Sequence, residues 1–300
     1  MKNKIHRSRA LDLRWIAVWA ALGWAAFASA ADRKIVMLAG HMSHGPGDHE
    51  FRAGSLLLQK CLASVPGVRV EVHRDDWPVD PEAAFAGADA VLVYADGNAA
   101  HPLLPPERTA LINRLAKSGV GLGFMHFAVG AIPERMGAQM HDWVGAYYQS
   151  AFSANPMWTP SFLPSPEHAV MRGVGSVDLR DEWYFHLRFR EDGVGTITPI
   201  LAANPGAAVR AGPYVYPKGP YPHVMANEGR PEIVMWTYER VDGGRSFGFT
   251  GGHSHENWGH DDFRKVVLNA MLWIAGAEVP AAGVESSVSA AELAANLDPK

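Results

Sequence analysis

The feature that most constrains the fold of this chain is an uncharged run that ends at a histidine. Residues 120–125 read Val-Gly-Leu-Gly-Phe-Met, and no charged side chain interrupts them. Such a run is typical of a central parallel strand that helices cover on both faces. His126 follows directly. Ligands of an open α/β sheet bind in the crevice beyond the carboxyl ends of its strands, so we expect His126 to face a binding site.

Strands and helices alternate along the first part of the chain. Residues 34–39, 68–72 and 88–94 predict strands, and apolar side chains recur at helical spacing over residues 51–65. A second helix is predicted over 105–117, where prolines stand in the first turn and their missing N–H donors do no harm. This alternation predicts an α/β fold with a parallel sheet and right-handed crossovers.

The chain becomes irregular after the run that ends at His126. Aromatic residues and prolines are interspersed over about residues 132–175, which predicts an aromatic-rich insertion over the edge of the sheet. A strand is predicted over residues 197–202. Residues 205–231 hold many Pro, Gly and Tyr residues, which indicate a long surface loop.

The last part of the chain returns to regular structure. Residues 232–238 and 246–250 predict two strands, joined as a hairpin at Asp242-Gly243-Gly244. An apolar stripe behind an Asp cap predicts a helix over residues 261–275. Residues 279–300 are rich in Ala and Ser and are predicted to form a C-terminal tail.

Residues 1–30 have the pattern of a secretory signal peptide. Basic side chains lie at the N-terminus, an uncharged run covers residues 15–27, and Ala28-Ser29-Ala30 is a cleavage signature. An uncleaved anchor helix is the alternative, although the run is short for a membrane span. We expect an exported protein, periplasmic in a bacterium with two membranes, with one α/β domain over residues 31–278.

Composition excludes several classes of function. The chain has 27 basic and 31 acidic residues, and removal of residues 1–30 leaves 22 and 30. This acidic balance argues against binding to nucleic acid or to an anionic membrane surface. Cys61 is the only cysteine, so an intramolecular disulfide is excluded. It lies in the apolar stripe of a predicted helix, where a thiol is unreactive, so cysteine-hydrolase chemistry is excluded too.

The order of the motifs resembles that of the ThuA-like (trehalose utilisation) family, in the class I glutamine amidotransferase-like superfamily. The motifs are G-F-M-H-F-A at 123–128, D-E-W-Y at 181–184 and G-F-T-G-G-H-S-H at 248–255. The resemblance covers roughly residues 33–278. It implies a flavodoxin-like, mostly parallel sheet flanked by helices. In the amidotransferases the elbow after this strand holds a nucleophilic cysteine, whereas His126 stands there in this chain.

Three histidines are candidate metal ligands. His49, His126 and His253 each follow a predicted strand or precede a helix, where the helix dipole disfavours the imidazolium form. Neutral imidazoles with Asp181 or Glu182 nearby would suit a divalent cation, zinc or manganese, with open positions. No compact motif such as H-E-x-x-H is present. The alternative is that one or two of these rings only hydrogen-bond to loop carbonyls.

Other histidines near these positions are further candidates. His255 lies two residues after His253, and in an extended segment both rings would face one ligand. A polar cap of the loop is the alternative. His41 and His44 lie in a glycine-rich loop and are weaker candidates, and His44 could equally be a solvated loop residue.

Aromatic and polar side chains near these loops are candidates for sugar binding. Aromatic faces stack on the C–H faces of sugar rings, and charged groups bind the hydroxyls. The alternative is that the aromatic residues belong to the core. The candidate substrate-binding residues are Asp96, Trp158, Tyr184, Arg188 and Trp258.

The family's association with disaccharide use implies a carbohydrate enzyme, and the residues fit chemistry on oxidised, 3-keto sugars. A ketone at C3 acidifies the C2 hydrogen. Glu182, with Asp181 nearby, could remove that proton while a metal or a neutral histidine stabilises the enediolate and His255 protonates the departing oxygen. The protein would then be a lyase or a hydrolase. The alternative is a non-catalytic carbohydrate-binding protein on the same scaffold, and either protein could form a homo-oligomer.

Overall fold

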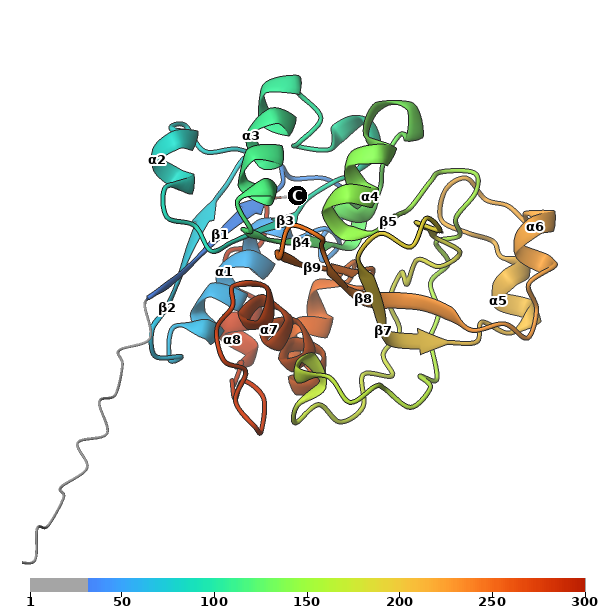
Figure 1. Cartoon of the computed structure of the whole chain (residues 1–300). Coiled ribbons are helices and arrows are strands. Elements are labelled where there is room, and N and C mark those ends of the chain that lie inside the picture. Colours follow the sequence, from blue (N-terminus) through green and yellow to red (C-terminus); the bar gives the residue numbers. More distant parts are fainter. Residues whose placement is uncertain (1–31, 300) are drawn as a thin grey trace, which may run out of the picture. The chain divides into compact units, whose positions relative to one another are not determined.

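A seven-stranded sheet forms the centre of the domain (Figure 1). The structure, a computed structural model, describes residues 32–299, so the predicted signal peptide lies outside the described residues. The strand order is β2-β1-β3-β4-β9-β8-β7. The strands are β1 (Arg33–Ala39), β2 (Val68–His73), β3 (Ala90–Tyr94), β4 (Gly121–Met125), β7 (Thr196–Ala203), β8 (Glu232–Glu239) and β9 (Arg245–Phe249).

The sheet has a parallel part and an antiparallel part. Every pair from β2 to β9 is parallel, whereas β8 runs antiparallel to both of its neighbours, β9 and β7. The mostly parallel sheet expected from the sequence is confirmed, and so is the hairpin between β8 and β9. Because β1, β3, β4 and β9 are parallel, the loops at their carboxyl ends meet at one edge of the sheet.

Helices cover both faces of the parallel part. In Figure 1, α1 and α7 lie on one face and α3 and α4 on the other. Side chains of β1 alternate between these layers, with Ile35 and Met37 on the first face and Val36 and Leu38 on the second. The helices are α1 (Phe51–Leu62), α2 (Pro81–Phe85), α3 (Pro106–Lys117), α4 (Ala138–Val144), α5 (Ala207–Ala211), α6 (Pro222–Met225), α7 (Asp261–Ile274) and α8 (Ala290–Leu293).

Glycine in β4 lets α7 pack closely on the sheet. A Cβ atom added to Gly121 would lie 2.1 Å from the carbonyl oxygen of Ile274, so no larger residue fits there without movement.

The expected Asp cap of α7 is wrong. His260 precedes the helix, and its Nδ1 atom accepts from the N–H of Phe263 at 3.5 Å, while Asp261 and Asp262 lie in the first turn.

The segment expected to be a long loop contains two short helices, α5 and α6. Arg210 of α5 is fully buried and pairs with Glu232 of β8 at 2.8 Å. Its guanidinium also donates to the carbonyl of Arg230 at 2.6 Å. A buried Arg that donates to several acceptors fixes residues 205–231 against the sheet. The hydrophobic periodicity of the sequence contains no information about such contacts.

Residues beyond 278 pack onto the domain. Val279 and Val284 are buried, and α8 contacts both α1 and the 3₁₀ helix η5 (His255–Gly259). The N–H of Asp298 donates to the Glu50 carboxylate at 2.7 Å, and Glu50 directly precedes α1. This segment therefore contacts the loop that enters the first helix.

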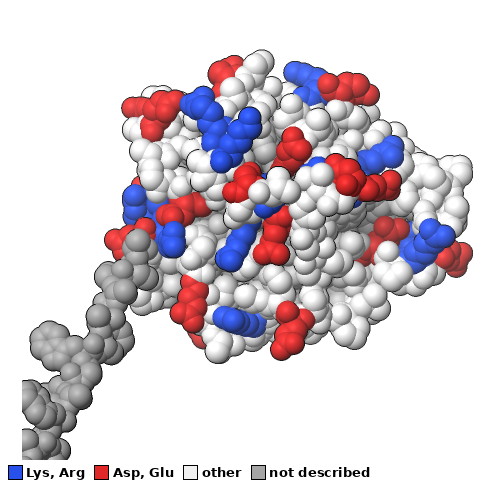
Figure 2. Space-filling model, in the orientation of Figure 1, with Lys and Arg blue, Asp and Glu red and all other residues white. Residues whose placement is uncertain are grey.

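The surface carries charges of both signs. In the face drawn in Figure 2, Lys and Arg side chains are interspersed with Asp and Glu, and no broad field of one sign forms there. No helix within residues 32–299 combines the length and apolar character that crossing a membrane requires.

Candidate functional site

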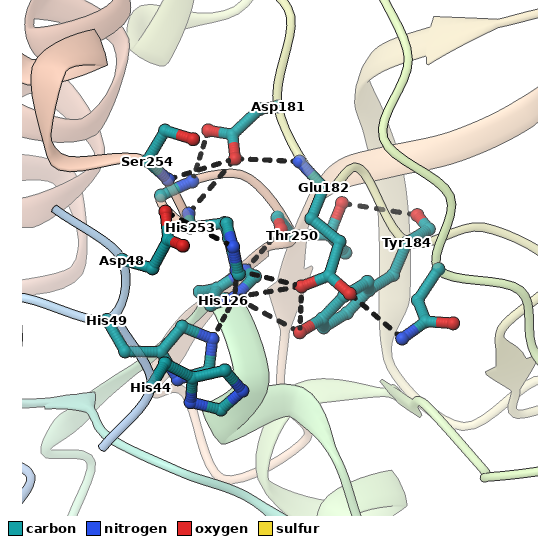
Figure 3. Close-up of polar contacts among 12 residues, drawn as sticks. His44, Asp48, His49, His126, Asp181, Glu182, Tyr184, Thr250, His253 and Ser254 are labelled. Carbon is teal, nitrogen blue, oxygen red and sulfur yellow. Dashed lines mark hydrogen bonds and ion pairs between the residues drawn. The ribbon is translucent and has the colours of Figure 1, made fainter. Parts of the chain in front are cut away.

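Four buried side chains from separate segments meet beyond the carboxyl ends of β4 and β9 (Figure 3). They are His49 from the loop before α1, His126 after β4, Glu182 from the irregular segment before β7, and His253 after β9. One possible ligand atom from each lies within 4.8 Å of the others. We call these four residues the His/Glu cluster. The fold therefore brings three imidazoles and one carboxylate from distant parts of the sequence together.

Two members of the cluster have strained backbones. His49 has φ 50° and His126 has φ 51°, in the left-handed region that non-glycine residues rarely adopt. Each such residue costs about 1–3 kcal/mol, and these conformations concentrate at functional sites. His126 turns sharply out of β4 into the 3₁₀ helix η2 (His126–Val129). This turn is what directs its ring into the cluster.

Hydrogen bonds to the outer nitrogens define which way the rings of His126 and His49 present their lone pairs. His126 Nδ1 lies 3.0 Å from the carbonyl oxygen of Thr250, which can only accept, so Nδ1 donates. His49 Nδ1 lies 2.9 Å from Oδ1 of Asp96 and donates likewise. The two Nε2 atoms therefore carry lone pairs in the neutral rings, and they face each other at 3.0 Å. Such an arrangement calls for a proton or a cation between them.

The pKa shifts of the cluster residues indicate which of them are charged. Burial, followed by the neighbouring imidazoles, holds the pKa of His49 far below its ordinary value, so its ring is neutral. Burial alone would raise the pKa of Glu182, but His126 and His253 outweigh it and lower this pKa to about 2. Burial would lower the pKa of His253, yet Glu182, 3.0 Å from its Nδ1, raises it. The cluster thus contains an ionised carboxylate among imidazoles.

Asp181 holds the loop of the cluster. Its carboxylate is fully buried and accepts from the N–H groups of Gly252 at 2.8 Å, His253 at 3.1 Å and Ser254 at 3.3 Å. It also accepts from the N–H of Glu182 at 2.8 Å. Because its oxygens are occupied by backbone donors, Asp181 positions His253 and Glu182, a different role from the catalytic one expected.

Glu182 is held by two neutral side chains that the motifs did not single out as a pair. Asn155 Nδ2 donates to its Oε1 atom at 2.9 Å, and the Tyr184 hydroxyl donates to its Oε2 atom at 3.3 Å. The same hydroxyl lies 3.1 Å from His126 Nε2. Burial and the nearby Glu182 raise the pKa of Tyr184, so its hydroxyl keeps its proton. Asn155 lies in irregular chain and carried no sequence signal.

A cavity of about 410 Å³ opens beside the cluster. This volume is within the range of small-molecule sites, about 300–1,000 Å³. Glu182, His49 and Tyr184 line its buried end. Phe127, Tyr148 and Tyr216 add an aromatic wall. The arrangement can thus bring a polar ligand with apolar faces against the ionised Glu182 carboxylate and the imidazoles of His44 and His49.

Comparison with known proteins identifies the family. The family described as ThuA, trehalose utilisation, matches residues 37–274. The chain belongs to the ThuA family. Two solved structures have the same fold, and no curated protein matches the chain. A putative ThuA-like protein from Bacteroides uniformis ATCC 8492 is 12% identical with a TM-score of 0.58, over 83% of this chain and 93% of that one.

The second structure is a putative ThuA-like protein from Parabacteroides merdae ATCC 43184. It is 14% identical with a TM-score of 0.53, over 83% of this chain and 92% of that one. At these identities the likeness shows the fold alone. The chemistry of the site in this ThuA-family protein therefore follows from its own residues.

His255 does not point into the cluster of this ThuA protein. The expectation that His253 and His255 face one ligand is wrong, because the chain turns into η5 at His255 instead of staying extended. Its Nε2 atom lies 2.8 Å from the carbonyl of Leu293. His44, the weaker candidate, does line the cavity, and its ring centroid lies 3.6 Å from that of His49.

The two tryptophans expected to stack on sugar are core residues of the ThuA domain. Trp158 is 6% exposed and Trp258 is 0% exposed. The indole of Trp158 donates to the carbonyl of Trp183 at 2.9 Å. Trp258 packs against the rings of Tyr94 and Phe263. Their faces are covered by protein, so this expectation is corrected.

Two charged residues expected to bind substrate lie elsewhere. The Arg188 guanidinium lies 3.3 Å from the ring centroid of Phe152 and donates to Gln149 at 2.8 Å, in a groove separate from the cavity. Asp96 orients His49 through Nδ1. Of the five candidates for sugar binding, only Tyr184 lines the cavity.

Proposed function

We propose that this protein is an exported, metal-dependent enzyme that cleaves the glycosidic bond of oxidised, 3-keto glycosides. The observation that carries the proposal is the His/Glu cluster, in which fixed outer hydrogen bonds direct imidazole lone pairs toward one another beside Glu182. The ThuA family's description as trehalose utilisation supports a carbohydrate substrate. The pattern of residues 1–30 supports export.

The donor set fits a divalent cation. Neutral imidazole nitrogens with a carboxylate are the ligands that zinc and manganese accept in proteins. Ligating histidines usually donate their other ring N–H to a carbonyl or carboxylate, as His126 does to Thr250 and His49 to Asp96. His49, His126 and His253 would hold the ion. When bound, it would supply Lewis-acid polarisation of the substrate's carbonyl oxygen.

Glu182 is the residue that moves the proton. It is ionised and borders the cavity, so it can accept the C2 proton that a C3 ketone acidifies. The C2–H electron pair forms the enolate, which then expels the glycosidic oxygen as the C1–O bond breaks. Protonated Glu182 returns the same proton to that oxygen. Water adding to the unsaturated ketone gives net hydrolysis, and release without water gives a lyase.

One carboxyl group replaces the acid and base pair expected from the sequence. His255 was expected to protonate the leaving oxygen, but its ring bonds to Leu293 away from the cavity. Asn155 and Tyr184 keep Glu182 oriented without a charge that would change its ionisation. If the C2 proton is removed and then given to the leaving oxygen on one face of the sugar, a single carboxyl group, Glu182, can carry out both transfers.

The test combines metal analysis with an assay. The purified protein is expected to hold about one zinc or manganese ion per chain and to release the leaving sugar from a 3-keto disaccharide. Chelation should abolish release, and adding the metal back should restore it. A metal-free protein that binds the sugar without turnover would instead be a carbohydrate-binding protein.

Export is tested separately. Mass spectrometry of the exported chain is expected to give an N-terminus at Ala31.

A further inference from the structure

The cavity has two ends of different character. Its buried end is formed by Glu182 and Tyr184, which are almost inaccessible to solvent. Its mouth is formed on one side by Val215 and Tyr216, and Tyr216 is 73% exposed. An exposed large aromatic side chain at the mouth of a ligand cavity is a candidate contact, because burial against a ligand removes its apolar surface from water.

Hydrogen bonds fix the backbone of Tyr216. Its N–H donates to Asn155 Oδ1 at 3.4 Å, and its carbonyl accepts from the Tyr148 hydroxyl at 3.4 Å. The N–H of Val215 donates to the Asn155 carbonyl at 3.2 Å. Tyr214, two residues earlier, is buried and its hydroxyl donates to the carbonyl of Arg210. The loop is therefore ordered before a ligand arrives, which lowers the entropy cost of binding.

Asn155 connects the two ends of the cavity. Its Nδ2 atom donates to Glu182 Oε1 at 2.9 Å, while its Oδ1 and carbonyl oxygens accept from the Tyr216 loop. One residue thus sets the spacing between the reactive carboxylate and the exposed aromatic ring. A ligand that contacts both Glu182 and Tyr216 must extend from the buried end of the cavity to its mouth. A single sugar ring with a methyl substituent does not need to extend that far.

We propose that Tyr216 determines specificity for the leaving group by stacking on a second sugar ring. This inference rests on the proposed function, in which the oxidised ring lies against Glu182. The glycosidic bond then directs the leaving group toward the mouth. A hexopyranose leaving group presents a C–H face that a tyrosine ring covers, whereas a methyl leaving group presents almost none. The preferred substrate is therefore a disaccharide.

The test compares two substrates in the wild-type protein and three variants. We assay each protein with a 3-keto gluco-disaccharide and with methyl 3-keto-glucoside. The variants are Tyr216→Ala, Tyr216→Phe and the control Val241→Ala. Val241 is an exposed residue of the distant β8–β9 turn. Tyr216→Ala is expected to lower the ratio of kcat/KM values, disaccharide over methyl glycoside, about 3- to 10-fold. Tyr216→Phe, which keeps the ring, and Val241→Ala should leave that ratio unchanged. Equal effects of Tyr216→Ala on both substrates would overturn the inference.

Calorimetry separates this inference from the reaction. The dissociation constants of the unoxidised gluco-disaccharide and methyl glucoside are measured with wild-type protein and Tyr216→Ala. If wild-type protein turns over neither keto sugar, the proposed reaction is wrong, but selective weakening of disaccharide binding in Tyr216→Ala would still support the stacking role. Unselective weakening, or no binding of either sugar to wild-type protein, would overturn it.

Discussion

The parallel part of the sheet and the irregular segment between α4 and β7 contribute to the site in different ways. The parallel part brings His126 and His253 to one edge because strands of the same direction end there. The irregular segment brings Glu182 and Asn155, which hydrogen-bond to each other, and backbone N–H groups of the loop after β9 hold it in place through Asp181. The comparison indicates a division of roles: the regular part would hold the cation, and the irregular part would supply the reacting carboxylate and shape the cavity.

The sharpest test of this division is Glu182→Gln. Loss of a general base typically costs about 10²- to 10⁴-fold in rate, so kcat should fall by that range. Metal content should stay near one ion per chain because three imidazoles remain. His126→Ala is the matched variant from the parallel part and should lose the metal itself. Loss of metal in Glu182→Gln with none in His126→Ala would reverse the assignment.

A smaller effect is expected from Asp96→Asn. Asp96 follows β3 and orients His49 through an Nδ1 contact of 2.9 Å. Loss of an outer partner of a ligating histidine typically costs about 10- to 100-fold in metal affinity, so competition with a chelator should show that weakening. The exposed Asp75→Asn serves as control and should bind metal like the wild type. Equal affinity in both variants would remove the orienting role of Asp96.

Asp181→Asn tests the connection between the two regions. An Asn amide turned toward the N–H groups of residues 252–254 would leave buried donors unsatisfied, at about 1–3 kcal/mol of unfolding free energy. Denaturant unfolding measures this loss. Glu285→Gln, which breaks an exposed pair with Lys265, should cost less than about 1 kcal/mol. Similar stability of the two variants would contradict the positioning role.

The smallest effect concerns the pH dependence of the metal-free protein. The pKa of Glu182 is lowered from 4.5, so its contribution to stability is present above pH 4.5 and is lost as pH falls toward 2. The pKa of His253 is raised from 6.5, so its contribution is present below pH 6.5 and is lost as pH rises through the raised value. Their pair should therefore stabilise the protein most between these limits, and Glu182→Gln should flatten that profile.

The sequence predicts the parts of the site that follow directly from regular structure. Strand β4 ends at Met125, so a histidine at 126 had to lie at the carboxyl edge of the sheet. The same reasoning placed His49 and His253 in loops near that edge. It failed for His255, because one turn of 3₁₀ helix rotates its ring toward Leu293. Alternation along a strand says nothing about such a turn.

Side chains in irregular chain could not be placed from the sequence. Trp158, Trp258 and Tyr216 are all large aromatic residues near turns, yet the first two are buried and the third is exposed. What separates them is packing against distant rings and the bonds that Asn155 makes to the Tyr216 loop. Local pattern contains none of this information, since these contacts join segments tens of residues apart.

The last residues of the described chain bear on how this protein can be shortened in the laboratory. Glu50 receives the N–H of Gly47 at 3.1 Å and that of Asp298 at 2.7 Å, directly beside His49. A version ending at residue 278 would uncover the surface of α7 where Val284 is buried and bonds to Asn269, and it would remove the Asp298 contact to Glu50. Crystallisation or tagging strategies should accordingly keep residues 279–299 intact.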